Sequence, residues 1–224
     1  MIYIKKQDDW STFLQIGKIY MHNLQTQKSE TRRLHILNSS FELVLRKGFA
    51  GVGLQEILKH CEVPKGSFYH YFQSKEAFGC DLLRNYIQDY QHRLTLIWNN
   101  DETAKIKILR YFELWIEAPD WENGWADSCL IVKLAAEVAD LSEEMRFIMD
   151  QGVTQLIARL TQLIEQGQTE QSIPTQMSAS LTAQTLYQMW LGAALLSKLQ
   201  KDKSPLHQAL HATQHLLTPL HSGI

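Results

Sequence analysis

The chain has 224 residues, of which 45% are hydrophobic and 21% charged, a composition typical of a globular protein with a sizeable core. Its net charge of −2 excludes a protein coated in positive potential, and no apolar run is long enough to cross a bilayer. The first residues are polar and lack a secretory signal, so we expect a cytoplasmic protein with no membrane partner.

Residues 1–27 form an N-terminal extension ahead of the first clear domain. They include an amphipathic stretch from Asp9 to Leu24 that is compatible with a helix. Met21 is a second candidate for the initiator methionine, and if translation starts there the residues before it are not part of the protein. Both interpretations of the extension remain open from the sequence.

Clear helix patterns run from Thr31 to the end of the chain, while the alternating pattern of strands is missing. Gly48 is a residue type that ends helices, Pro64 follows the end of another helix, and Ser74 and Ser142 are good N-caps. The sequence therefore predicts an all-α fold. The predicted helices are 31–48, 54–61, 65–72, 74–98, 101–117, 128–140, 142–166, 177–200 and 204–217, with longer loops at 119–127 and 167–176.

Charge is distributed unevenly along this helical chain. Ten basic and seven acidic residues lie between Lys28 and Arg93, so this segment carries about +3 and the rest of the chain about −5. A mildly basic front end on an acidic body is typical of a protein that touches nucleic acid through one face.

The most distinctive motif of the chain is the run from Val63 to Glu76. It joins a helix stop, a tight turn, a short aromatic helix and the N-cap of the next helix. A helix this short is not stable alone, because nucleation is costly, so it needs neighbours that hold it. Its small, hydroxylated and basic residues suit a surface that contacts phosphates and base edges. We therefore predict a helix-turn-helix in which 65–72 is the recognition helix.

The side chains of this motif divide into those expected to contact DNA and those expected to face inward. Lys65 and Gly66 lie at the start of the helix, where free N–H groups and a cation bind phosphate and a missing Cβ lets DNA approach closely. Lys75, at the start of the next helix, is expected to hold a further phosphate. The side chains expected to face bases and phosphates are Ser67, Tyr69 and His70; those expected to face inward are Phe68, Tyr71 and Phe72.

These motifs resemble the TetR family of bacterial transcriptional repressors. The resemblance lies in Gly48-Phe49, in the predicted helix 54–61 and in the run from Val63 to Glu76. It implies a helix-turn-helix DNA-binding domain of three helices, here residues 28–88, and a helical ligand-sensing and dimerisation domain, residues 89–224. It also implies a homodimeric repressor that binds double-stranded palindromic operator DNA. Leu54 departs from the family, in which many members have a threonine that touches phosphate, and this puts one backbone contact in doubt.

Cys129 is the candidate sensor residue of the second domain. It follows Asp127 and Ser128, which are good N-cap residues, so its sulfur is expected in the first turn of helix 128–140. The helix N-terminus, with Lys133 one turn on, is expected to lower the pKa of the thiol and so make it a better nucleophile. A buried cysteine acting as a small hydrophobic residue is the alternative. Three tryptophans supply apolar walls for a small organic electrophile: Trp115, Trp121 and Trp125.

The segment from Ser128 to Arg146 resembles the electrophile-responsive repressors of the TetR family, and shorter matches extend this resemblance over about residues 30–200. That subgroup senses quinones, reactive aldehydes and hypochlorous acid, and it represses detoxification genes. The resemblance places the sensor cysteine on Cys129 and its partner lysine on Lys198. A lysine there stabilises the thiolate, and its amine is able to capture an oxidised sulfur.

Several alternatives accompany this interpretation. A repressor released by reversible binding of a small aromatic inducer remains open. An enzyme is disfavoured, because no catalytic triad, P-loop, dinucleotide fingerprint or HExxH motif is present, and no cofactor is expected.

Three histidines lie four residues apart on the last helix without a carboxylate or cysteine in phase, so we predict no metal site there: His207, His211 and His215. The predicted seam of the dimer consists of Leu186, Met189, Ala193 and Leu196.

Overall fold

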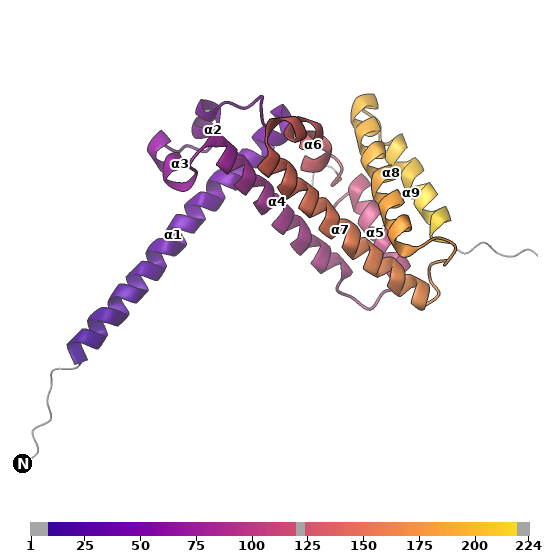
Figure 1. The fold of residues 1–224 in the computed structure, drawn as a ribbon, viewed down its shortest axis with the longest axis horizontal. Helices are drawn as coiled ribbons and strands as arrows, with labels where there is room; N and C mark the ends of the chain where they lie inside the picture. The colour runs from indigo at the N-terminus through magenta and orange to yellow at the C-terminus, as the bar shows by residue number, and fades with distance from the viewer. Residues whose placement is uncertain (1–8, 120–123, 219–224) are drawn as a thin grey trace, which may run out of the picture.

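The structure is a computed structural model that describes residues 9–119 and 124–218, with side chains from residue 27 onward. Trp121 therefore lies outside the described residues. Within them all regular structure is helical, as predicted. The helices, labelled in Figure 1, are α1 (Asp9–Lys47), α2 (Leu54–His60), α3 (Lys65–Tyr71), α4 (Lys75–Trp98), α5 (Ala104–Ile116), α6 (Leu130–Leu141), α7 (Glu143–Thr169), α8 (Ala179–Gln200) and α9 (Ser204–Leu216).

The first helix is longer than predicted. The amphipathic stretch from Asp9 and the helix predicted from Thr31 are one continuous helix, α1, whose N-terminal half projects away from the body of the molecule (Figure 1). Its end is where the sequence indicates: Gly48 has φ +80°, a left-handed conformation that glycine adopts without steric cost. The chain turns there toward α2.

Hydroxyl side chains define the starts of four later helices. Ser74 accepts a hydrogen bond from the Ala77 N–H, and Ser142 accepts one from the Met145 N–H, so both predicted N-caps are confirmed. Thr103 and Ser178 cap α5 and α8 in the same way. These caps satisfy N–H groups that have no partner within the helix.

The predicted end of α7 at Gly167 is wrong. The helix continues to Thr169, and Gly167 is a buried position inside it. A Cβ on Gly167 would clash with the Ile173 side chain, so the glycine allows the loop after α7 to pack directly on the helix. Tertiary packing, and not helix termination, accounts for this residue.

The core of the second domain is built around α7, which packs against α4, α5, α6 and α8. Aromatic rings fill its centre: Phe112 stacks on Trp190 with centroids 4.5 Å apart, and the Trp190 indole N–H donates to Thr213 at 2.9 Å. Figure 1 shows α4 and α7 side by side, with α6 between the end formed by α1, α2 and α3 and the body. No helix in the described part of the chain is long and apolar enough to span a membrane.

Candidate DNA-binding surface and sensor site

The short helix α3 is held by aromatic packing on its inner side. Phe68 is fully buried, and its ring centroid lies 5.1 Å from that of Phe72 and 5.5 Å from that of Phe78 on α4. This packing supplies the stability that seven helical residues lack alone. The inward orientation predicted for Phe68 and Phe72 is confirmed, while Tyr71 is half-buried at the edge of the core.

The opposite side of α3 faces solvent. Lys65, Gly66, Tyr69 and His70 are exposed and Ser67 is half-buried. The Lys65 ammonium lies 5.8 Å from the centroid of the Tyr69 ring, so these two predicted contact residues share one surface. A Cβ on Gly66 would meet no atom of this chain within 4 Å. Packing within the chain therefore does not require a glycine at this position.

Lys75 is arranged differently from the free phosphate ligand that we expected. Its ammonium donates to the Phe49 carbonyl at 2.8 Å and lies 4.7 Å from the centre of the Phe49 ring. Burial lowers the pKa of Lys75, and the Glu137 carboxylate partly offsets this effect. Lys75 thus holds the turn between α1 and α2, while Lys65 is the exposed cation of the motif.

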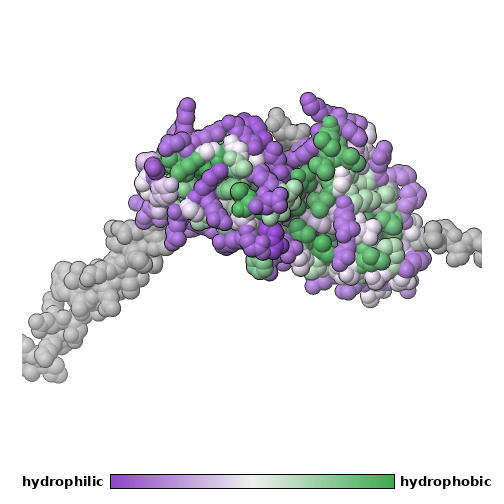
Figure 2. All heavy atoms as spheres, turned by 45° about the horizontal axis from the view of Figure 1, so that its top comes forward, coloured by the Kyte–Doolittle hydropathy of each residue, from purple (hydrophilic) through white to green (hydrophobic). Residues whose placement is uncertain are grey.

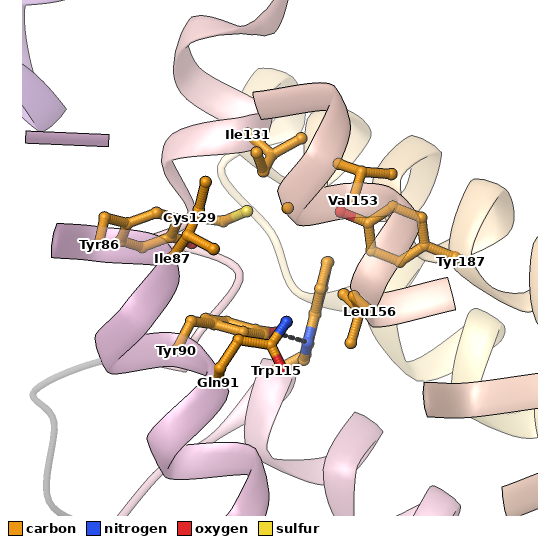
Figure 3. A pocket seen from close by; sticks show the side chains of 11 residues that line it. Tyr86, Ile87, Tyr90, Gln91, Trp115, Cys129, Ile131, Val153, Leu156 and Tyr187 are labelled. Carbon is orange, nitrogen blue, oxygen red and sulfur yellow. Dashed lines mark hydrogen bonds between the residues drawn. The ribbon is translucent and has the colours of Figure 1, made fainter. Parts of the chain in front are cut away.

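The sensor candidate Cys129 is the N-cap residue of α6, so the predicted cap at Asp127 and Ser128 is one to two residues too early. Only 3% of Cys129 is exposed. Its sulfur faces a small cavity between α4, α5, α6, α7 and α8 (Figure 3). The cavity is lined by Tyr86, Ile87, Tyr90, Gln91, Trp115, Ile131, Gly152, Val153, Leu156 and Tyr187.

The thiol pKa differs from the sequence prediction in its direction. Burial raises the pKa of Cys129, and this effect outweighs everything that stabilises the thiolate. The opposing groups that lower the pKa are, in order, the Val132 N–H, the Tyr86 hydroxyl, the Ile131 N–H and the Lys198 ammonium. The helix N-terminus acts in the predicted direction, but desolvation wins because the sulfur is almost fully enclosed.

A raised pKa makes a testable prediction about reaction rate. Because the thiolate is the nucleophile, alkylation of Cys129 by iodoacetamide is expected to accelerate about tenfold per pH unit through neutral pH. A thiol with a lowered pKa would instead reach a plateau. Peptide-mapped mass spectrometry of Cys129 between pH 6 and pH 9 measures the profile, with glutathione as a reference thiol. A plateau at or below neutral pH would contradict a raised pKa.

The two lysines predicted to assist the thiol have separate roles. Lys198 donates to the Asp127 carbonyl at 3.2 Å, close to the sulfur, and burial lowers its own pKa. Lys133 does not assist the thiol: it donates to the Arg46 carbonyl of α1 at 3.2 Å. The prediction for Lys133 is therefore wrong, and that for Lys198 is compatible with the geometry.

A hydrogen-bonded aromatic cluster stands beside the sulfur, and the sequence did not identify it. The Tyr90 hydroxyl pairs with that of Tyr111 at 2.9 Å and accepts from the Trp115 indole at 3.2 Å. Tyr86 contacts the thiol itself. Of the predicted tryptophans, Trp115 lines the cavity, whereas Trp125 packs on Tyr90 with centroids 5.5 Å apart.

Helix α6 runs from Cys129 to the segment that joins α1 and α2. Cys129 lies at its start, and Glu137 two turns on accepts a hydrogen bond from the Ala50 N–H in the turn after α1. The same carboxylate lies against Gly48, where a Cβ would come within 2.7 Å of it. Lys133 contacts Arg46 of α1 in addition, so two side chains of α6 hold the end of α1 and the turn that follows it.

The three histidines of α9 are exposed, and the rings of His211 and His215 lie 4.7 Å apart. Among the described residues no group of three or more His, Cys, Asp or Glu side chains is placed to hold a metal ion. Cys61 and Cys80 are buried away from the cavity, and burial raises the pKa of each, that of Cys80 to about 11.

Comparison with known proteins identifies the family. Residues 36–78 match the family of bacterial regulatory proteins of tetR type, and residues 104–213 match the tetracyclin repressor-like C-terminal domain. The HTH-type transcriptional repressor NemR of Escherichia coli is 42% identical over 189 residues, which cover 84% of this chain and 94% of that repressor. The chain belongs to the TetR family.

Other relatives agree with this assignment. The repressor DhaR of a Mycobacterium species is 31% identical, covering 84% of this chain and 92% of its own. The crystal structure of reduced E. coli NemR has a TM-score of 0.77 at 40% identity and covers 85% of this chain and 99% of its own. A crystal structure of a TetR/AcrR family regulator has the same TM-score at 57% identity and covers 84% and 100%. This TetR-family chain is therefore a DNA-binding transcriptional regulator, and not an enzyme.

Proposed function

We propose that this TetR-family protein is a homodimeric repressor that binds a palindromic operator and is released when Cys129 reacts with an electrophile or oxidant. One observation carries the proposal: the thiol lies at the start of the same helix, α6, that contacts the turn after α1 through Glu137. A displacement at one end of a rigid helix reaches its other contacts directly. The resemblance to electrophile-responsive repressors and the likeness to NemR support it.

The chemistry at Cys129 is a conjugate addition when the inducer is a quinone or a maleimide. The thiol loses its proton to solvent, and the thiolate electron pair forms a C–S bond to the unsaturated carbon. The π electrons of the C=C bond move to the carbonyl oxygen, which takes up a proton from water or from the Tyr86 hydroxyl, itself then reprotonated by solvent. The adduct keeps all atoms of the electrophile, and it occupies space that the small cavity does not offer.

Lys198 extends the same site to oxidants. A two-electron oxidant such as hypochlorous acid converts the thiolate to a sulfenic acid and is reduced to chloride. The Lys198 amine then attacks the oxidised sulfur, and an S–N bond forms as water leaves. Burial lowers the pKa of Lys198, which raises the fraction of neutral amine available for this step.

Release then follows from the altered position of α6. The bulk added at Cys129 moves α6 and, through Glu137 and Lys75, the turn between α1 and α2 and the start of α4. The two recognition helices of the dimer no longer match successive major grooves, which lie about 34 Å apart. A shift from mostly bound to mostly free requires about 5 kcal/mol, which formation of a covalent bond can supply.

The cavity size disfavours the alternative of a reversible aromatic inducer. The cavity has a volume of about 30 Å³, which is room for on the order of one or two water molecules. An aromatic ligand must displace buried side chains using only its own binding energy, whereas a small oxidant fits and an alkylator gains a covalent bond.

The proposed dimer rests on an exposed apolar face of α8. Leu186 and Ala193 of the predicted seam are buried within the chain itself, so that part of the prediction is wrong. Leu196 remains exposed, and Figure 2 shows hydrophobic side chains gathered over this end of the molecule. The exposed leucines of α8 are Leu181, Leu195, Leu196 and Leu199. Such a face favours pairing with a second copy.

A footprint upstream of the gene for this protein tests the whole proposal. Purified protein is expected to protect a palindrome of two half-sites, and protection is expected to disappear after treatment with benzoquinone or hypochlorous acid. Reductant restores binding after the oxidant only. A protected site that is insensitive to both reagents would leave a repressor without thiol sensing.

The Glu137→Ala variant tests the link between sensor and DNA-binding domain. In wild-type protein, alkylation is expected to raise the operator Kd. In the alanine variant, which lacks the acceptor for the Ala50 N–H, this rise in Kd is expected to be about tenfold smaller. A tenfold effect corresponds to the loss of about one charge-assisted hydrogen bond. Fluorescence anisotropy with labelled operator measures both states. The Glu137→Gln variant keeps an acceptor oxygen and serves as the matched control. Unchanged coupling in the alanine variant would exclude this contact as the link.

A further inference from the structure

The walls around Cys129 are deeply buried on most sides and only half-buried on one. Tyr86, Tyr90, Trp115, Leu156 and Tyr187 are all buried, each less than 10% exposed. The other lining residues are half-buried, which places the thinnest part of the wall at the seam of α4 and α7, next to the start of α6: Ile87, Gln91, Ile131, Gly152 and Val153. In Figure 3 Ile87 and Gln91 on α4 face Val153 and Leu156 on α7 across this seam.

A larger surface groove lies directly outside this seam. Its volume is about 660 Å³, and it shares three lining residues with the sensor cavity: Ile87, Gln91 and Gly152. The groove continues along α4 and α7 past the exposed Phe147. Its charged residues, Arg84 and Glu144, form an ion pair at 2.8 Å, so the lining carries no net charge. Because the lining carries no net charge, the groove does not favour anions over cations, and neutral electrophiles can enter it.

We propose that electrophiles reach Cys129 from this groove through a gate formed by Ile87 and Gly152, and that the width of the gate selects small ones. The inference rests on Cys129 being the reacting thiol. At the gate α7 has no side chain, and the Ile87 side chain of α4 fills the space: a Cβ on Gly152 would lie 2.7 Å from Ile87 Cδ1. The gate therefore opens when the Ile87 side chain rotates, and any residue larger than glycine at 152 obstructs it.

The test compares labelling rates of Cys129 in the full-length protein and three variants. The reagents are N-ethylmaleimide and the bulkier N-phenylmaleimide, and peptide-mapped mass spectrometry separates Cys129 from Cys61 and Cys80. Ile87→Ala is expected to accelerate labelling by N-phenylmaleimide about tenfold, and labelling by N-ethylmaleimide less. Gly152→Val is expected to slow both about tenfold, the effect of inserting methyl groups into a packed wall. Gln155→Ala, which lines the groove but not the cavity, is the matched control and keeps wild-type rates.

Size selection at the gate requires the ratio of the N-phenylmaleimide rate to the N-ethylmaleimide rate to rise in Ile87→Ala. The same ratio in wild type and Ile87→Ala would therefore overturn the gate, even if Gly152→Val fails to fold. Rates in urea-unfolded protein give the intrinsic reactivity of each reagent and serve as the reference. Operator binding measured on the same samples separates this inference from the proposed function. If labelling follows the gate variants but operator binding does not follow labelling, the gate stands and thiol-triggered release fails.

Discussion

The Cys129→Ser variant is expected to bind operator with wild-type affinity and to stay bound after treatment with N-ethylmaleimide, benzoquinone or hypochlorous acid. A serine hydroxyl has a pKa far above neutral, so it does not react with these compounds at pH 7. Wild-type protein treated in the same way is expected to lose about a hundredfold or more in operator affinity. The variant separates the reaction at one sulfur atom from every other effect of the reagents.

Folding is not expected to confound this variant. Serine is a favourable N-cap residue, and Cys129 occupies the N-cap of α6 with the N–H groups of Ile131 and Val132 facing it. The loss of a buried sulfur is therefore partly offset by a better cap. Circular dichroism and thermal unfolding verify the fold, and gel shift or anisotropy with labelled operator measures release.

The other two cysteines provide the controls. Cys61 and Cys80 are buried with raised pKa values and lie outside the cavity, so Cys61→Ser and Cys80→Ser are expected to respond like the wild type. Release of Cys129→Ser by any of the three reagents at wild-type concentrations would show that the switch lies elsewhere. Only the TetR-family assignment and its DNA-binding domain would then remain.

The Phe68→Ala variant is expected to lose about 3–5 kcal/mol of folding free energy in the DNA-binding domain. Phe68 is fully buried and contacts the rings of Phe72 and Phe78, which tie the recognition helix to α4. Without this anchor, seven residues of helix have too few hydrogen bonds to persist. At the low end of ordinary stability, about 5 kcal/mol, this loss leaves as little as about half of the domain folded, so operator affinity is expected to fall with the folded population by up to about twofold.

Urea unfolding followed by circular dichroism, together with operator anisotropy, checks this prediction. The matched control is Tyr69→Ala, one residue on and 45% exposed, which is expected to change stability by less than about 0.5 kcal/mol while still weakening DNA binding. An unfolding midpoint for Phe68→Ala equal to that of the wild type would show that the ring packing does not hold α3.

Most of the fold was accessible from sequence because helices are local. Ser74 and Ser142 cap α4 and α7 through bonds to N–H groups three residues away, and Gly48 ends α1 through its own φ angle. The errors lie where distant packing decides. At Gly167 both Ile173 and the distant Ala104 of α5 pack against α7, and the residues next to Gly167 in the chain do not indicate this packing.

The sequence by itself determined the family motif, the all-helical fold and the identity of the sensor candidate, since these depend on short-range patterns and on resemblance. Only the tertiary structure decided the environment of Cys129: its burial, the direction of its pKa, and the reach of α6 to Ala50 through Glu137. Desolvation and long-range contacts depend on which helices surround a group, and residues 87 positions apart in the chain carry no local signal of their meeting.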